Sequence, residues 1–408
     1  MLDKENDILT RGVTDREIEH TLRLLNSDKA PGPDGFPASF FKAYWPIIRK
    51  EVCDGIRSFF QSGQMPISWK STFLALIPKV PNPQSPAQFR PISLCNTLYK
   101  IVVKIMVNRL KPLLPKLIAQ EQGAFVEGRS ILENVLLAQE LLHSIERASV
   151  ANGGMVVKVD MERAYYDRLR WDYLVEVLWK YGFSEKWIKW TRGCVEDTHF
   201  SVLVNGSPTN WFSSKVGLRQ GCPLSPYLFI LCFDSLSRAL KNAAEEGYIE
   251  GIRCGPGCPP VTHLLYAEDC LLTVRATKTN CLNLKQIVYE YCVQSGQAVN
   301  FCKSMLRFSP AVNRRRQANM ASILGISINK GTWIYLGTPI SGRRLRASDF
   351  GFHVEKINRR LAGWKSSSLS MAGRLVLAQS VLAMIPVYWL GCTAMHRSLL
   401  AYVERCIR

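Results

Sequence analysis

Apolar and polar positions in the first 150 residues alternate mainly with the spacing of amphipathic helices. Thr14 and Glu17 form a capping box before an apolar stripe, which predicts a helix directly after Thr14. Between this helix and the next, "FLALIPK" predicts a strand, and the end of "FRPISLCNTLYKIVVKIMVNRL" predicts a helix. The segment "ILENVLLAQELLHSIERA" predicts a further helix, whose apolar stripe comprises Leu132, Val135, Leu136, Leu142 and Ile145.

Short β-branched runs and turn signals replace this pattern after residue 150. "MVVKVD" predicts a strand that ends at Asp160, and a helical pattern begins directly after it. "FSVLVNGSPTNWF" predicts a hairpin that turns at Asn205 and Gly206. "GLRQGCPLSPYLFILCFDSLSRAL" predicts a glycine-rich loop before a buried helix, with Ser225 as N-cap and Pro226 as the first helical residue.

The rest of the chain predicts one tight strand pair among further helices. "CLNLKQIVYEYCVQSG" predicts a helix that ends at Gly296, and "TWIYLGTPI" predicts a strand pair or turn. Beyond Arg343 the sequence is basic and helical up to "AYVERCIR", where it has no stop signal. We therefore expect this chain to be cut from a longer one.

Two adjacent acids interrupt an apolar run in "VTHLLYAEDCLLTV", which predicts a hairpin within a sheet. Burying an unpaired carboxylate is costly, so Glu268 and Asp269 need a cation or a metal, or they become protonated. Strand side chains alternate between faces, so one of the two would normally share a face with Asp160; a hairpin turn can bring both close to it.

Carboxylates from neighbouring strands suit magnesium, a hard cation that prefers oxygen ligands. Two such ions about 4 Å apart support in-line phosphoryl transfer. The alternative is a structural network in which the acids pair with Arg or Lys. These residues by themselves leave both interpretations open.

Charge favours a polyanionic partner. Among 408 residues, 52 Lys and Arg face 33 Asp and Glu, for a net charge of +19. Nucleic acid is the first such partner, an anionic membrane surface the second, and a merely basic soluble protein the simplest alternative. The longest apolar stretch, 227–233, is too short to cross a bilayer, and the charged N-terminus lacks the apolar core of a signal peptide.

Thirteen cysteines, an odd number in mostly apolar surroundings, indicate reduced thiols in an intracellular protein. Cys254 and Cys258, with His263 nearby, offer part of a zinc site. Their spacing lacks a clear fourth ligand, so zinc is a subsidiary hypothesis.

Motifs along the chain resemble those of LINE-type, non-LTR retrotransposon reverse transcriptases, in the same order and with the plant branch nearest. They are "KAPGPDGFPASFFK", "LIPK", "FRPISLCNTLYKI", "EQGAFVEGRSILENVL", "KVDMERAYYDRL", "GLRQGCPLSPYLF", "LLYAEDC", "SGQAVNFCKS" and "YLGTPI". The resemblance covers roughly 15–345 and implies an α+β right-hand polymerase fold with an antiparallel palm sheet. We expect fingers over 1–150, a palm with a primer-grip turn over 151–342, and thumb helices over 343–408 with a truncated C-terminus.

The resemblance also implies a role for each matching residue. Asp160, Glu268 and Asp269 would be the catalytic ligands of two Mg²⁺ ions, with Mn²⁺ as a possible substitute. Lys79 and Arg90 would bind the triphosphate, Tyr165 would exclude a ribose 2′-hydroxyl, and Lys303 would act on the departing pyrophosphate. Gln220 and Gly221 would lie under the template–nucleotide pair, and Tyr335, Leu336 and Gly337 would form the primer grip. The residues expected along the duplex are Arg343, Arg344, Arg346, Arg359 and Arg360. Taken as single residues, Tyr165 fits an aromatic core position, and Lys79 and Arg90 fit solvated surface charges.

The implied partners are an RNA template, a DNA primer and deoxynucleoside triphosphates, with no membrane and action in the nucleus. Oligomeric state is not indicated. The implied function is RNA-directed DNA polymerisation. A reverse transcriptase of the group II intron maturase kind is a further alternative, against which the plant-LINE-like wording of the motifs argues.

Two departures from the family pattern lie near the acids. Glu268 occupies a position that is usually Asp, and its extra methylene displaces the carboxylate by about 1 Å, an error that can cost about a hundredfold in rate. Tyr166 resembles an inserted residue, which would rotate Trp171, Tyr173 and Leu174 by about 100° unless a bulge absorbs it. These departures favour the alternative of a decayed copy that binds nucleic acid without polymerase activity.

Overall fold

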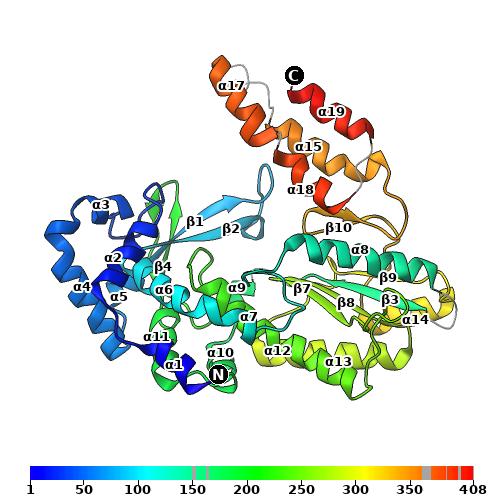
Figure 1. Cartoon of the computed structure of the whole chain (residues 1–408), viewed down its shortest axis with the longest axis horizontal. Coiled ribbons are helices and arrows are strands. Elements are labelled where there is room, and N and C mark those ends of the chain that lie inside the picture. Colours follow the sequence, from blue (N-terminus) through cyan, green and yellow to red (C-terminus); the bar gives the residue numbers. More distant parts are fainter. Residues whose placement is uncertain (149–152, 162–164, 361–368, 383, 394–396, 408) are drawn as a thin grey trace. The chain divides into compact units, whose positions relative to one another are not determined.

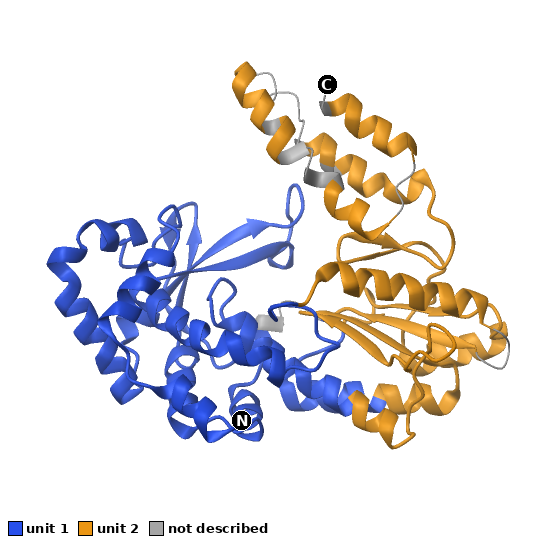
Figure 2. Cartoon of the chain, viewed as in Figure 1, with its two compact units in different colours: residues 1–128, 161–239, 286–299 blue, residues 129–160, 240–285, 300–408 orange. Residues whose placement is uncertain are grey.

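The computed structural model describes residues 1–148, 153–161, 165–360, 369–382, 384–393 and 397–407. The chain divides into two compact units, which Figure 2 shows in different colours. Unit 1 comprises 1–128, 161–239 and 286–299, and unit 2 comprises 129–160, 240–285 and 300–408. Two of the boundaries between the units fall inside helices, namely α12 (Ser225–Glu245) and α13 (Lys278–Ser295).

Unit 1 combines helices with a five-stranded sheet of order β2-β1-β4-β5, in which β6 also pairs with β4. Strands β1 and β4 are parallel, and the other pairs are antiparallel. Its elements are α1 (Asp3–Thr10), α2 (Asp15–Leu24), α3 (Ala38–Ala43), α4 (Trp45–Ser62), α5 (Ile67–Lys70), β1 (Thr72–Pro78), η1 (Pro86–Gln88), β2 (Phe89–Cys95), α6 (Thr97–Leu110), η2 (Lys111–Leu113), α7 (Leu114–Leu117), α9 (Tyr165–Arg168), α10 (Trp171–Lys180), α11 (Glu185–Val195), β4 (His199–Val204), β5 (Ser207–Pro208) and β6 (Phe212–Ser213).

Local sequence signals account for several of these boundaries. The Glu17 N–H donates to Thr14 Oγ1 over 3.2 Å, which confirms the predicted cap of α2. Asn205 and Gly206 have positive φ angles of 50° and 85°, as a two-residue hairpin turn requires, so the predicted β4–β5 hairpin is confirmed. The helix predicted at Pro226 instead includes Ser225, because the Leu228 N–H donates to the Leu224 carbonyl; the predicted cap is wrong by one residue.

The extra Tyr166 does not turn the following segment out of the core. Helix α9 ends at Arg168, and α10 begins only at Trp171, with Tyr173 and Leu174 buried. At the break, the Arg170 N–H donates to the Ser295 carbonyl over 3.0 Å. Because the helix is interrupted, a rotation of about 100° is not transmitted, and the alternative in which an irregularity near the helix start absorbs the extra residue describes the structure.

Unit 2 is built on a four-stranded antiparallel sheet of order β7-β8-β3-β9. Figure 1 shows α8 along one face of this sheet and α13 along the other. The elements of this unit, besides α13, are α8 (Ile131–Arg147), β3 (Gly154–Val159), β7 (His263–Tyr266), β8 (Asp269–Arg275), β9 (Met305–Phe308), α14 (Arg314–Leu324), β10 (Trp333–Tyr335), β11 (Thr338–Ile340), η4 (Ala347–Phe350), α15 (Gly351–Arg360), α17 (Met371–Leu377), the π-helical turn η5 (Ala378–Leu382), α18 (Met384–Cys392) and α19 (Arg397–Ile407).

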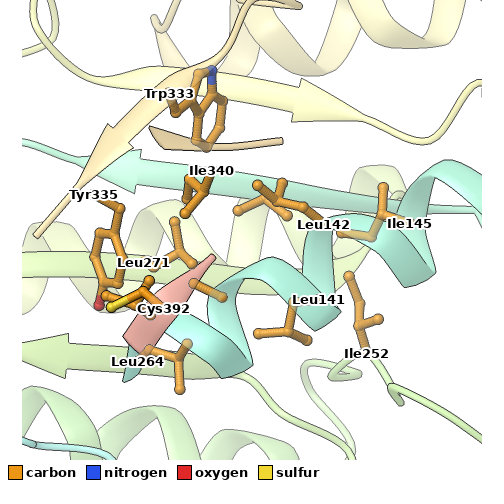
Figure 3. Close-up of a cluster of buried hydrophobic side chains, with 13 residues drawn as sticks. Leu141, Leu142, Ile145, Ile252, Leu264, Leu271, Trp333, Tyr335, Ile340 and Cys392 are labelled. Atoms are coloured by element: carbon orange, nitrogen blue, oxygen red, sulfur yellow. The ribbon is translucent and has the colours of Figure 1, made fainter. Parts of the chain in front are cut away.

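One hydrophobic core joins α8, the sheet and the β10–β11 hairpin (Figure 3). Val135, Leu142 and Ile145 are fully buried, as their helical spacing predicted. Leu136 was predicted on the same stripe but is 45% exposed, because it lies 100° around the helix from Val135. Leu141 occupies the buried face in its place.

The predicted strand pair in "TWIYLGTPI" is the β10–β11 hairpin. Leu336 and Gly337 form its turn with φ angles of 49° and 78°. Tyr388 Oη donates to the Leu336 carbonyl over 2.8 Å, and His353 Nε2 lies 3.1 Å from the Gly337 carbonyl. The C-terminal helices therefore hold this turn from the side.

Replacing Gly337 by Ala is expected to lower the free energy of unfolding by about 1 kcal/mol, because a Cβ disfavours the left-handed conformation. A Cβ there would meet no atom within 4 Å, so the cost is conformational and not steric. Gly351→Ala is the matched control, since that site is equally open but right-handed helical. Urea unfolding should show a loss for the first variant only; equal losses would contradict the argument.

The helices predicted beyond Arg343 form a small core of their own. Phe350, Ile357, Trp389, Leu399 and Val403 are its buried members. The His353 ring lies 3.9 Å from that of Trp389. In the described part of the chain, no helix has both the length and the apolar character needed to cross a membrane.

Candidate active site

The register of the unit 2 sheet brings two of the predicted acids together. Strands β3 and β8 are antiparallel, and Val159 pairs with Cys270. One residue further along, Asp160 comes opposite Asp269, the first residue of β8. The buried β-branched run of β3 therefore ends with a carboxylate that faces a second one across the ladder.

The two carboxylates interact electrostatically. Burial raises the pKa of Asp269, and the neighbouring Asp160 charge raises it further, while Lys158 acts in the opposite direction. Lys158 itself donates to the Ile334 carbonyl over 2.6 Å. Two like charges side by side in a partly desolvated place are stabilised by a bound cation, so these residues fit a metal.

Glu268 lies on the turn between β7 and β8 and is exposed. Ala267, the other turn residue, has a φ of 51°, which is uncommon for a residue with a Cβ. Over the described residues, no group of three His, Cys, Asp or Glu side chains is close enough together to hold a metal ion. The register therefore brings Asp160 and Asp269 together, and Glu268 lies on the turn directly before Asp269.

The turn that carries Lys303 is fixed to the backbone of Asp160. The Asn300 N–H donates to the Asp160 carbonyl over 2.8 Å, and the Asp160 N–H donates to Ser304 Oγ over 3.0 Å. The side chain of Lys303 is exposed on this turn. Two hydrogen bonds to the same turn thus hold the position of Asp160 at the strand end.

Tyr335 of the β10–β11 hairpin is buried near Asp269. Burial raises its pKa, and the charge of Asp269 contributes in the same direction. Figure 3 shows its ring among the side chains of the core, near Cys392. Tyr335, next to the predicted primer-grip turn, therefore lies near Asp269 in unit 2.

The predicted triphosphate residues lie on the β1–β2 hairpin of unit 1. Arg90 pairs with Ile77 across the hairpin, and its side chain is exposed. Lys79 follows β1, and its Nζ donates to the Ala87 carbonyl over 3.2 Å. Both cations are available to solvent, which agrees with either a phosphate site or a surface charge.

Gln220 and Gly221 lie against strand β2. The Ser93 N–H donates to the Gln220 carbonyl over 2.7 Å. Gly221 has a φ of 108°, and a Cβ there would lie 3.0 Å from the Ser93 carbonyl oxygen. Both the conformation and the close approach therefore require glycine.

A cavity of about 250 Å³ in unit 1 adjoins this loop and contains two charged residues that the sequence analysis missed. Arg219 is buried, donates to the Lys70 carbonyl over 3.0 Å, and lies 3.9 Å from the Tyr99 ring. Desolvation raises the pKa of Asp167 to about 6, and Lys79 partly opposes this. The sequence did contain a signal for Arg219, because a charged residue there follows Leu218 and precedes a Gln-Gly pair. The acids in the apolar run are charged residues in an uncharged setting of the same kind.

The remaining predicted residues show mixed settings. Arg343 pairs with Asp349 at 3.2 Å, and Arg359 pairs with Glu355 at 3.1 Å. Exposed positions are Arg344 and Arg346. The side chains of Tyr165, Tyr166 and Arg360 lie outside the described residues.

The zinc hypothesis has no support in the part of the chain that the structure describes. His263 is buried in β7, with Nδ1 2.8 Å from Thr262 Oγ1. Cys254 and Cys258 are partly exposed, and burial raises the pKa of the Cys254 thiol, with the neighbouring Cys258 contributing. Together they form no cluster of three potential ligands there.

An antiparallel sheet with two carboxylates at a strand end is consistent with a right-hand polymerase. The family described as "Reverse transcriptase (RNA-dependent DNA polymerase)" matches residues 77–340, and the chain belongs to this family. Its fold is accordingly the α+β right-hand fold that the motifs predicted. Members of this family generally use divalent metal ions.

Several relatives come from transposable elements. The chain is 28% identical to the transposon TX1 uncharacterized 149 kDa protein of Xenopus laevis, over 99% of this chain and 30% of that protein. It is 27% identical to the Pol polyprotein of the type-1 retrotransposable element R2 of Popillia japonica, over 63% of this chain and 35% of that protein. An uncharacterized mitochondrial protein of Arabidopsis thaliana is 48% identical over 73 residues, 17% of this chain and 60% of that protein. The chain spans about a third of the length of the first two relatives.

Proposed function

We propose that this chain extends a DNA primer on an RNA template, using two Mg²⁺ ions, with Mn²⁺ as a substitute. The observation that carries the proposal is Asp160 opposite Asp269 at the end of a buried antiparallel ladder. Family membership supports it. When bound, the metals supply charge stabilisation for the attacking and leaving oxygens of an in-line displacement.

The chain's own residues hold the reactants in this proposal. Asp160 and Asp269 provide carboxylate oxygens at a position that the Asn300–Ser304 turn keeps fixed. Lys79 and Arg90 bind the triphosphate, and Lys303 donates a proton to the departing pyrophosphate. A guanidinium suits bidentate phosphate contact, which supports the role of Arg90.

Nucleotide and primer contacts complete the proposal. Tyr165 excludes a 2′-hydroxyl, Gln220 and Gly221 contact the template–nucleotide pair, and the Leu336–Gly337 turn with Tyr335 positions the primer. In the same proposal 1–150 are fingers, 151–342 palm and 343–408 thumb, with Arg343, Arg344, Arg346, Arg359 and Arg360 along the duplex. The 48% identity to a plant protein over 73 residues supports a plant origin. We further propose action in the nucleus.

A primer-extension assay on an RNA template tests this function. Purified protein, a 5′-labelled DNA primer and the four deoxynucleoside triphosphates should yield extended primer with Mg²⁺. Chelation by EDTA should abolish the product, and Mg²⁺ in excess should restore it. Absence of extension at every Mg²⁺ and Mn²⁺ concentration would refute the proposal.

Glu268 favours a second candidate, a nucleic-acid-binding remnant without polymerase activity. Its carboxylate is on an exposed turn, whereas Asp160 and Asp269 face each other on the ladder. This candidate predicts salt-sensitive binding of a primer–template with no extension. The same assay, combined with a binding measurement, separates the two functions.

A further inference from the structure

A long stretch of this chain contains only positive charges. Between Glu290 and Asp349 the sequence has no acidic residue, although the whole chain has 33 acids in 408 residues, about one in 12. The basic residues of this stretch are Lys303, Arg307, Arg314, Arg315, Arg316, Lys330, Arg343, Arg344 and Arg346. Some of them belong to the proposed active site and thumb, but the three consecutive arginines do not.

The strand register places these arginines at the end of the sheet remote from the acids. Strand β9 pairs with β3 so that Phe308 lies opposite Met155, and the Ser309 N–H donates to the Gly154 carbonyl. Asp160 is at the other end of β3, roughly 20 Å from Gly154 at about 3.3 Å per residue. Helix α14 begins just beyond Phe308, so its first turn lies far from the carboxylates.

Helix α13 begins at the same end of the sheet. Gly154 pairs with Arg275, and Lys278 is the first residue of α13. Arg316 Nη2 donates to the Ala276 carbonyl over 2.9 Å, which ties the start of α14 to the segment that leads into α13. Cations from two helices are thereby gathered on one surface of unit 2.

Four of these cations are exposed, and Arg316 among them is bonded to the Ala276 carbonyl. We call the other three, Lys278, Arg314 and Arg315, the distal basic surface. The side chains of these three residues make no hydrogen bond or ion pair with another described residue. The acid Glu250, near the start of α13, is already paired with Arg275 at 3.0 Å. The charge of the surface is therefore not neutralised by the described neighbours.

The cations of the distal basic surface are not explained by a contribution to fold stability. Positive side chains in the first turn of a helix oppose the helix dipole, and adjacent like charges repel. Helix α14 has three arginines in its first turn and no acidic residue there. An anionic partner removes both penalties, and a polyanion can contact all three exposed cations together.

We propose that the distal basic surface binds the phosphate backbone of the RNA strand outside the catalytic site. This inference rests on the proposed function, which supplies an RNA template. Contacts of this kind depend on salt and not on base sequence. The distal basic surface would hold one part of the RNA template while another part of the same RNA lies at the carboxylates.

Charge reversal tests the surface without the reaction. Lys278→Glu, Arg314→Glu and Arg315→Glu are combined in an Asp160→Asn background, and binding of a 40-nucleotide single-stranded RNA is measured from 50 to 200 mM salt. Loss of three phosphate contacts should reduce the slope of log K against log salt by about 2, and affinity should fall at least about tenfold. Because the new acids agree with the helix dipoles, the melting temperature should not fall.

Lys4→Glu, Arg16→Glu and Lys50→Glu form the matched control, with the same charge change on exposed residues of unit 1. Equal losses of RNA affinity in both triple variants would mean that only net charge matters, and would overturn the surface. If the triple variant lost affinity only for single-stranded DNA of the same length, the assignment to RNA would be overturned. The assignment would also be overturned if the variant lost affinity only for vesicles of equal parts phosphatidylserine and phosphatidylcholine.

Failure of this inference is distinguishable from failure of the polymerase function. With Asp160 intact, the triple variant should extend a primer normally on an RNA that ends close to the primer, and poorly on one with long single-stranded extensions. If the wild-type chain does not extend a primer, but the triple variant still shows the reduced salt slope for RNA binding, only the polymerase function is refuted. Normal extension and unchanged RNA slopes in the triple variant would refute only the distal basic surface.

Discussion

Asp160→Asn and Asp269→Asn are each expected to reduce the rate of primer extension by about a thousandfold or more. Each change removes one negative charge from the pair that would hold the metals. Loss of a single preorganised electrostatic group costs on the order of 10²–10³ in rate, and loss of a metal ligand adds to this. Single-turnover extension on an RNA template at saturating Mg²⁺ measures the effect.

A control at another acid separates this effect from misfolding. Asp7→Asn makes the same chemical change on an exposed residue of α1 and should leave the rate unchanged. The carboxamide is close in size to the carboxylate, so the Asp160→Asn and Asp269→Asn variants should melt as the wild type does. Retention of more than a tenth of the rate in either variant would exclude the carboxylate pair as the catalytic centre.

Glu268→Asp is expected to increase the rate of extension, by up to about a hundredfold. The shorter side chain brings the carboxylate back by about 1 Å, and a misplacement of that size in a catalytic group can cost a hundredfold. The turn tolerates the change, since Glu268 is exposed and the Tyr266–Asp269 pair closes the hairpin on either side of it. Steady-state extension by the variant and the wild type, at equal Mg²⁺, provides the comparison.

Deletion of Tyr166 is the informative companion to this variant. Because α9 ends at Arg168 and α10 begins at Trp171, an added residue does not rotate the buried Tyr173. The deletion should therefore add little to Glu268→Asp. Equal rates in wild type, Glu268→Asp and the double variant would remove the idea that Glu268 impairs this copy.

Much of the candidate site was predictable from short-range patterns. The acids interrupt apolar runs, so their unusual chemistry is visible without a fold, and Asn205-Gly206 and Leu336-Gly337 mark tight turns in the sequence. The failures have different causes. Leu136 was assigned from helical periodicity, which does not show which neighbour covers a side chain. Ser225 was assigned from cap preference, which does not fix a helix boundary to the residue. The rotation after Tyr166 assumed a continuous helix, whereas α9 ends at Arg168.

The sequence alone determined the family, the acidic residues and the excess of positive charge, because these depend on the identity and order of residues. Only the tertiary structure decided which acids meet. The pairing of Val159 with Cys270 brings Asp160 opposite Asp269, while Glu268 is at the exposed turn. The same register gathers Lys278, Arg314 and Arg315 at the remote end of the sheet. Strand register joins residues more than a hundred positions apart, and no local pattern specifies it.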